Sequence, residues 1–189
     1  MTGSSPNLPA DGQKRANPSP QGGPTMRIGH GYDLHRLDDH PPNGQGRPFI
    51  LGGVRIEHNR GPVGHSDADA LLHAITDALL GAIGEPDIGQ LFPDTDPRHE
   101  SQDSSDFVRE ALMRVNDRGM SIVNLDATVV CEQPKIGPHR DQIISNIARL
   151  LGVDASVVNV KGKTHEKLDS IGQGNAIEVH CVVLLSGAM

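Results

Sequence analysis

The chain has 189 residues, which suits a single domain, and a formal net charge of −7 with histidine counted as neutral. It holds three Phe, one Tyr and no Trp, so aliphatic residues must build the core, and stacking of bases on an aromatic surface is excluded. The acidic balance argues against a nucleic-acid partner, because phosphates attract basic surfaces, and no apolar run of about 18 residues is present to cross a membrane. Ten histidines in such a chain favour metal binding or acid–base chemistry.

Composition also separates the N-terminal segment from the rest. Residues 1–25 hold five of the fourteen prolines and few apolar side chains, so we expect a disordered tail, without the apolar stretch of a secretory signal. Residues 26–189 are expected to form one domain. Cys131 and Cys181 are too few for a disulfide framework, and we expect both to be buried in a protein of a reducing, cytoplasmic compartment.

From residue 26 onward the hydrophobic pattern predicts elements in a definite order. The first are a strand over 26–32, a hairpin or bulged strand over 48–58 around Gly52 and Gly53, and a helix over 66–83. A second helix over about 104–118, a strand over 122–131, a third helix over 138–151, and strands over 157–161 and 177–185 follow. This order predicts an α+β sandwich in which helices cover one face of a sheet.

The helix over 66–83 carries the clearest local signals. Ser66 and Asp69 have the spacing of a capping box, apolar residues recur at helical spacing, and Gly84 is placed to end the helix.

The first group of chemical interest is Asp33 and His35, directly after the first expected strand. Residues two apart in an extended chain point the same way, so this carboxylate and imidazole would converge on one point. His73, in the middle of the long helix, would complete an open tetrahedral zinc site. The spacing equally allows Asp69 and His73 to be the metal pair, or Asp69 to orient the His73 ring. It also allows both histidines to be ordinary half-buried side chains.

Gly64, His65 and Ser66 stand at the expected start of the same helix. Free N–H groups and the positive end of the helix dipole favour an anion there, so a phosphate would bind with His65 as an added donor. Plain capping by Ser66 is the simpler alternative.

Three further segments combine groups that suit a nucleotide ligand. Residues 87–97 hold three acids and two prolines, which predict a structured loop for a divalent cation or ribose hydroxyls, or a simple turn. The turn over 132–139 offers backbone amides around Pro134 and Lys135 to a base edge and a phosphate. Residues 161–167 set Lys and Thr donors beside Glu166, as a diphosphate and its cation require. For the last two segments the alternative is an ordinary exposed loop.

Together and in this order, these motifs resemble one family. Residues 27–35 (RIGHGYDLH) and 64–73 (GHSDADALLH) closely resemble the 2-C-methyl-D-erythritol 2,4-cyclodiphosphate synthases of the non-mevalonate isoprenoid pathway. The segments 87–89 (DIG), 92–96 (FPDTD), 134–135 (PK) and 163–166 (KTHE) match the same family, so the resemblance covers the chain from residue 26 to its end.

The resemblance implies a lyase that converts 4-diphosphocytidyl-2-C-methyl-D-erythritol 2-phosphate to a cyclic diphosphate and CMP. The 2-phosphate attacks the β-phosphorus, so the protein folds the substrate and neutralises its charge rather than supplying a nucleophile. It further implies a four-stranded mixed sheet with helices on one face, and a homotrimer with active sites between subunits.

The family's site residues transfer to this chain motif by motif. Zinc would be held by Asp33, His35 and His73, which makes Asp69 a supporting residue, and Mg²⁺ or Mn²⁺ would be held by Glu166. His65 and Thr164 would stabilise the transition state. The residues implied to contact the substrate are Asp33, Leu34, His35, His65, Ser66, Asp87, Ile88, Gly89, Phe92, Pro93, Asp94, Thr95, Asp96, Cys131, Glu132, Gln133, Pro134, Lys135, Ile136, Gly137, Lys163, Thr164, His165 and Glu166.

The chain departs from the family pattern at Ser170 and Gln173, where many members have a phenylalanine and an arginine. The resemblance therefore does not lead us to expect that a central cavity of the trimer binds an anion in this protein. Two other functional classes stay open. A metal-dependent phosphohydrolase would use the same zinc site to activate water, and a non-catalytic nucleotide-binding protein would not need the intact metal ligands.

Overall fold

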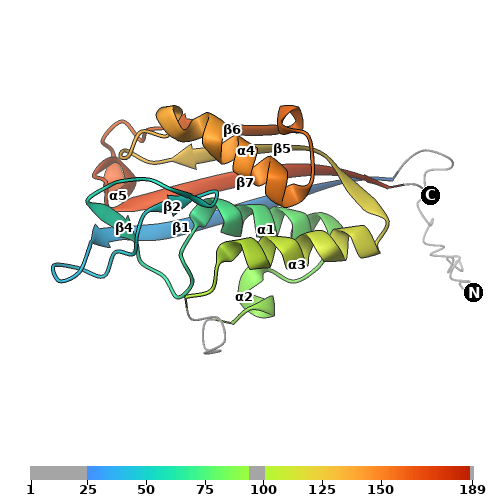
Figure 1. Ribbon diagram of the computed structural model, residues 1–189, viewed down its shortest axis with the longest axis horizontal. Helices are drawn as coiled ribbons and strands as arrows, with labels where there is room; N and C mark the ends of the chain where they lie inside the picture. The colour runs from blue at the N-terminus through green and yellow to red at the C-terminus, as the bar shows by residue number, and fades with distance from the viewer. Residues whose placement is uncertain (1–24, 94–100, 188–189) are drawn as a thin grey trace, which may run out of the picture.

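The computed structural model describes residues 25–93 and 101–187, and Figure 1 shows a layer of strands with helices packed against it. The tail expected over residues 1–25 lies, except for Thr25, outside the described residues. No helix in the described part of the chain is long and apolar enough to cross a membrane.

A five-stranded sheet in the order β4-β1-β7-β5-β6 forms one layer of the molecule. Its strands are β1 (Thr25–Asp39), β4 (Arg60–Pro62), β5 (Met120–Val130), β6 (Val158–Lys163) and β7 (Ala176–Gly187). Only β5 and β6 are parallel, so the sheet is mixed, as predicted. The predicted strand number of four was wrong: β4, three residues long and too short to show an alternating pattern, pairs with the end of β1 and makes five.

The first strand is also much longer than predicted. It spans 15 residues, so Asp33 and His35 lie within it rather than after it. Its inward positions hold glycine, aspartate and histidine instead of apolar residues, and this composition hides the alternation from which strands are predicted. The predicted hairpin is confirmed: β2 (Ile50–Leu51) pairs with β3 (Val54–Arg55), and Gly52 and Gly53 take positive φ at the turn.

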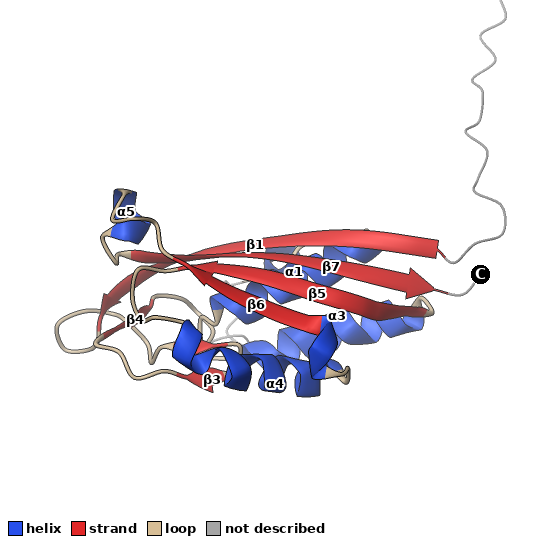
Figure 2. Ribbon diagram, turned by 90° about the horizontal axis from the view of Figure 1, so that it is seen from above, coloured by secondary structure: helices blue, strands red, loops and turns tan. Residues whose placement is uncertain are grey.

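Three helices cover one face of the sheet, as Figure 2 shows. They are α1 (Ala70–Ile83), α3 (Ser104–Asp117) and α4 (Arg140–Leu151). The short elements α2 (Ile88–Leu91), η2 (Gly137–His139), η3 (Ala155–Val157) and α5 (Asp169–Gly172) lie in the connections. Helix α1 packs on β1 and β7, α3 on α1, and α4 on β6.

Two local predictions were wrong. Helix α1 begins at Ala70 with Asp69 as its N-cap, because Ala68 takes a left-handed φ of 60° that interrupts any helix starting at Ser66. The segment after Asp87 begins with the helical turn α2 instead of a loop, because the Asp87 carboxylate caps it by accepting from the Gln90 N–H at 2.9 Å.

The core lies between the sheet and the helices. The inward residues of β7, among them Val179, Cys181 and Val183, are completely buried. Cys131 is buried as well, and both cysteines are free, as predicted. The other face of the sheet is different: no helix of the described chain covers β1 there (Figure 2), and its apolar side chains are exposed. They are Met26, Ile28, Tyr32 and Leu34, with Val182 of β7 beside them.

Candidate active site

Two glycines allow β1 to lie directly against α1. A Cβ on Gly31 would stand 1.8 Å from the carbonyl oxygen of Ala74, and a Cβ on Gly29 would stand 1.8 Å from that of Ala78. Any side chain at either position would collide with the helix backbone. Since Asp33 continues the same face of β1, and His73 precedes Ala74 on α1, this close contact brings strand and helix side chains together.

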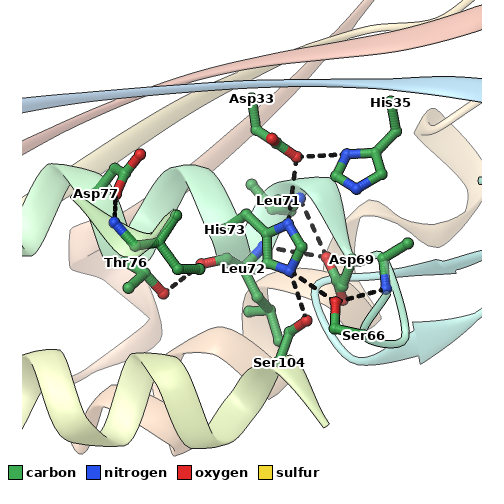
Figure 3. Close-up of polar contacts among 12 residues, drawn as sticks. Asp33, His35, Ser66, Asp69, Leu71, Leu72, His73, Thr76, Asp77 and Ser104 are labelled. Carbon is green, nitrogen blue, oxygen red and sulfur yellow. Dashed lines mark hydrogen bonds and ion pairs between the residues drawn. The ribbon is translucent and has the colours of Figure 1, made fainter. Parts of the chain in front are cut away.

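Asp33, His35 and His73 form a group in which one ligand atom from each lies within 4.8 Å of the others. Asp33 Oδ2 is 2.7 Å from His35 Nδ1 and 3.5 Å from His73 Nδ1, as drawn in Figure 3. The shorter contact lacks hydrogen-bond geometry, so Asp33 Oδ2 and His35 Nδ1 are buried atoms without a hydrogen-bond partner in the described structure. A carboxylate and two imidazoles that converge in this way fit a zinc-class metal ion, with a further position open to a ligand.

The electrostatics of this group keep its carboxylate charged. Burial alone would raise the pKa of Asp33, but the imidazoles of His35 and His73 outweigh burial and lower the pKa to about 2. Asp33 is therefore ionised at neutral pH, as a metal ligand must be. Burial lowers the pKa of His73, whereas its contact with Asp33 raises it, and the net direction is upward. A metal ion therefore competes with protons for that ring more strongly than it would for a free histidine.

The far nitrogen of His73 is held by groups that the sequence did not single out for this role. His73 Nε2 lies 2.9 Å from Ser104 Oγ and 3.1 Å from Ser66 Oγ (Figure 3). Ser104 is completely buried, and its hydroxyl donates to the Asp67 carboxylate, which also accepts from the Ser104 N–H at 3.1 Å. When His73 Nε2 donates its proton to Ser104 Oγ, the other ring nitrogen, Nδ1, carries the lone pair. Nδ1 faces Asp33 and is therefore the atom that can bind a metal ion.

Asp69 is engaged elsewhere. It is completely buried, and its Oδ1 accepts from the N–H groups of Gly52 at 2.9 Å, Leu71 at 3.1 Å and Leu72 at 3.0 Å. Its Oδ2 accepts from the Gly53 N–H at 2.6 Å. Both oxygens are used, so the structure gives no support to an Asp69–His73 metal pair. Asp69 instead ties the β2–β3 turn to the start of the helix that carries His73.

A cavity of about 470 Å³ opens beside the metal-ligand group, a size typical of small-molecule sites. It is lined by Asp33, His35, Gly64, His65, Ser66, His73, Ile88, Gly89, Phe92 and Phe107. The structure thus brings together the three predicted groups that contain Asp33, His65 and Ile88, and adds Phe107 of α3. Asp87 stays outside the lining and caps α2, and Asp94, Thr95 and Asp96 lie outside the described residues. The Leu34 side chain is on the opposite, open face of the sheet, 49% exposed.

Arg47 supports the loop that carries His65, from outside the cavity lining. Its Nε donates to the Gly64 carbonyl at 2.7 Å, and its two terminal nitrogens donate to the His65 carbonyl at 3.1 Å and to Ser101 Oγ at 3.2 Å. The predicted helix N-terminus at Gly64, His65 and Ser66 was wrong, because α1 starts beyond Ser66 and its first N–H groups bind Asp69. No sequence signal pointed to Arg47, since it lies in no motif and two of its three partners are backbone carbonyls.

A second cavity, of about 270 Å³, is formed where β5 and β6 end. It is lined by Cys131, Lys135, Ile136, Gly137, Pro138, Gly162, Lys163 and Thr164. The Thr164 hydroxyl donates to Glu166 at 2.8 Å, and His165 Nδ1 contacts Asp169 Oδ1 at 3.0 Å. The predicted neighbours Glu132, Gln133 and Pro134 belong to the same loop, and the Cys131 thiol donates to the Gln133 carbonyl at 2.8 Å.

The two cavities share no lining residue. Within one chain the structure therefore does not place Thr164 beside His65. Glu166 is likewise no member of the metal-ligand group formed by Asp33, His35 and His73.

The fold and the first cavity define an α+β protein in which a carboxylate and two imidazoles, a set of metal-ligating side chains, line a cavity of small-molecule size. The chain belongs to the YgbB family, whose model matches residues 26–186. This confirms the resemblance, because relatives named 2-C-methyl-D-erythritol 2,4-cyclodiphosphate synthase match most of the chain. The chloroplastic one of Arabidopsis thaliana is 53% identical over 160 residues, which cover 85% of this chain and 67% of the relative. That of Dechloromonas aromatica is 51% identical over 160 residues, which cover 85% of this chain and 96% of the relative.

Solved structures give the same result. The structure described as IspF of Plasmodium falciparum in complex with CDP superposes with a TM-score of 0.75 at 40% identity. The match covers 87% of this chain and 97% of that one.

Proposed function

We propose that this chain is a lyase that converts 4-diphosphocytidyl-2-C-methyl-D-erythritol 2-phosphate to 2-C-methyl-D-erythritol 2,4-cyclodiphosphate and CMP, in non-mevalonate isoprenoid biosynthesis. The observation that carries the proposal is the convergence of Asp33, His35 and His73 on a cavity that His65 and Ser66 also line. The names of the relatives agree with it.

The chain's own residues supply binding and charge compensation rather than a nucleophile. Asp33, His35 and His73 would hold a zinc ion, which would act as a Lewis acid toward the β-phosphate. His65 would donate to phosphate oxygens where negative charge develops, from a loop that Arg47 keeps in place. The reacting 2-phosphate is its own nucleophile, and burial raises the pKa of the Cys131 thiol to about 12, which suits a structural cysteine.

The second cavity would hold the CMP part. Lys135 and Lys163 line it with cationic donors, and Thr164 adds a hydroxyl that would contact the diphosphate in the transition state. Glu166, next to Thr164, would hold Mg²⁺ or Mn²⁺ with the diphosphate. The segments 87–89 and 92–96 would contact the methylerythritol part.

We also propose a homotrimer with active sites between subunits. Two features support it: a single chain keeps the two cavities apart, and the apolar side chains on the open sheet face lack cover from the described chain. The proposed location is cytoplasmic, in keeping with two free, buried cysteines. The Arabidopsis relative, by contrast, is named as chloroplastic.

Phosphorus NMR of the product tests the activity. The protein is incubated with the diphosphocytidyl substrate and Mg²⁺, with and without a chelator, and we expect a cyclic diphosphate with CMP that the chelator suppresses. Linear phosphates would instead establish the phosphohydrolase, and CDP binding without turnover would establish a nucleotide-binding protein.

A His73→Ala variant should lose zinc and activity but keep CMP binding. Full zinc content in that variant would overturn the ligand assignment. Light scattering of the purified protein tests the trimer.

A further inference from the structure

A second cluster of metal-ligating side chains lies on the open face of the sheet, away from the cavity. His30 on β1 and His180 on β7 lie side by side, with 3.4 Å between His30 Nε2 and His180 Nδ1. Their rings are stacked, with centroids 5.6 Å apart and planes inclined by 29°. Asp33 and His35 point to the helix-covered face of the same strand, so this pair is separate from the candidate active site.

The orientation of the His180 ring is fixed by its neighbours. Its Nε2 lies 2.9 Å from Glu178 Oε1, so this nitrogen carries a proton and donates it to the carboxylate. Nδ1 of the neutral ring is then an unprotonated lone pair directed at His30. Glu178 is held in turn by the Tyr32 hydroxyl, which donates to Glu178 Oε2 at 3.4 Å. The Tyr32 ring also lies against the His180 ring, with 5.1 Å between the two ring centroids.

We propose that His30 Nε2 and His180 Nδ1 bind a divalent transition-metal ion of the zinc class, at a site distinct from Asp33, His35 and His73. Two nitrogens bound to one tetrahedral zinc ion at about 2.0–2.1 Å each are about 3.4 Å apart, so the pair already has the required separation. A carboxylate on the far nitrogen of a ligating histidine is the usual partner that orients such a ring, and Glu178 holds that position.

Proton balance is simple at this site. Without an ion, His30 donates the Nε2 proton to His180 Nδ1. With an ion, neutral His30 keeps its single proton on Nδ1, and no proton is released. One chain supplies two ligands, so water or equivalent histidines of neighbouring copies complete the coordination. The site does not depend on the proposed function, because none of its residues lines either cavity.

Metal counting with matched variants tests this proposal. Chelator-treated protein is titrated with Zn²⁺ by calorimetry, and the bound zinc is then measured after gel filtration. We expect the wild type to bind more zinc than one ion per chain. This additional class of bound zinc should be absent from both His30→Gln and His180→Gln. Glu178→Gln should weaken that class about tenfold, and His139→Gln, a control histidine in η2, should leave it unchanged. Equal zinc content in the wild type, His30→Gln and His180→Gln would overturn the proposal.

A measurement on the unsubstituted protein guards against variants that fail to fold. Crystals soaked in Zn²⁺ and measured at the zinc absorption edge should show an anomalous peak between His30 Nε2 and His180 Nδ1. A peak at Asp33, His35 and His73 without one between His30 and His180 would also overturn it.

Discussion

Gly31 lies so close to α1 that a Cβ in its place would stand 1.8 Å from the carbonyl oxygen of Ala74. A Gly31→Ala substitution must push strand and helix apart, and we expect it to lower the free energy of unfolding by about 3 kcal/mol. It should also weaken zinc binding, because Asp33 and His73 lie on the two elements that separate. Urea unfolding and zinc titration measure both effects.

Gly81→Ala is the matched control within α1. The nearest atom to a Cβ there is the His30 carbonyl oxygen at 3.8 Å, so the added methyl group fits. We expect a gain in stability of about 0.5–1 kcal/mol from improved helix propensity. Wild-type stability and zinc affinity in Gly31→Ala would show that the close contact is not required.

Ser104→Ala removes the closer of the two hydroxyl partners of His73 Nε2, at 2.9 Å against 3.1 Å for Ser66, without touching a metal ligand. The ring then loses its link to Asp67, and we expect zinc affinity to fall about tenfold, as for other groups that orient metal-bound histidines. Competition with a chromophoric chelator measures the affinity, and nitrogen NMR reports the His73 tautomer. Ser105→Ala is the control, since its hydroxyl has no hydrogen-bond partner in the described structure. Equal affinities in the two variants would contradict the assigned role of Ser104.

Arg47→Gln removes the guanidinium that fixes the His65 loop through two backbone carbonyls. We expect kcat/KM to fall roughly tenfold to a hundredfold, because small displacements of a positioned group are costly to turnover. Zinc content should stay the same, since Arg47 contacts none of the three ligands. Arg55→Gln is a suitable control, because that side chain is 68% exposed and only weakly paired with Glu57. Loss of zinc in Arg47→Gln would point to a general structural role instead.

The two buried thiols should make the protein sensitive to alkaline pH. Burial raises the pKa of both Cys131 and Cys181 to about 12, whereas an unfolded cysteine ionises near about 8.5. Between these values the unfolded chain loses its thiol protons first. The free energy of unfolding is thus unaffected below about pH 8.5 and falls by about 1.4 kcal/mol per pH unit per thiol above it. Urea unfolding at several pH values measures this slope, and Cys181→Ala should halve the cysteine contribution. An unchanged slope in Cys181→Ala would contradict the assignment of this pH dependence to the buried thiols.

The sequence predicted the parts of the site that depend on short-range spacing. Asp33 and His35 converge because alternate residues of any extended chain do so, whether or not the strand is recognised. The part of β1 that follows Gly29 and Gly31 could not be predicted as a strand, since Asp33 and His35 stand where apolar residues would produce an alternating pattern. The register between β1 and α1, which selects His73 over Asp69, depends on those glycines and became visible only in three dimensions.

Contacts between distant segments were beyond prediction for a different reason. Arg47 and Ser104 act on the site through backbone carbonyls and through another side chain, and such partners leave no motif in a sequence. The same holds for Asp69, whose carboxylate looks like a candidate ligand until the N–H groups of Gly52 and Gly53 are seen to occupy it.

The absence of any shared lining residue between the two cavities bears on inheritance as well as on chemistry. In the proposed assembly, each working site takes one cavity from each of two neighbouring chains. A chain that has lost its metal ligands and a chain that has lost its Lys135–Thr164 cavity would then restore some intact sites when they assemble together. Two defective alleles expressed in one cell would complement each other, and the unit on which selection acts is the oligomer rather than the polypeptide.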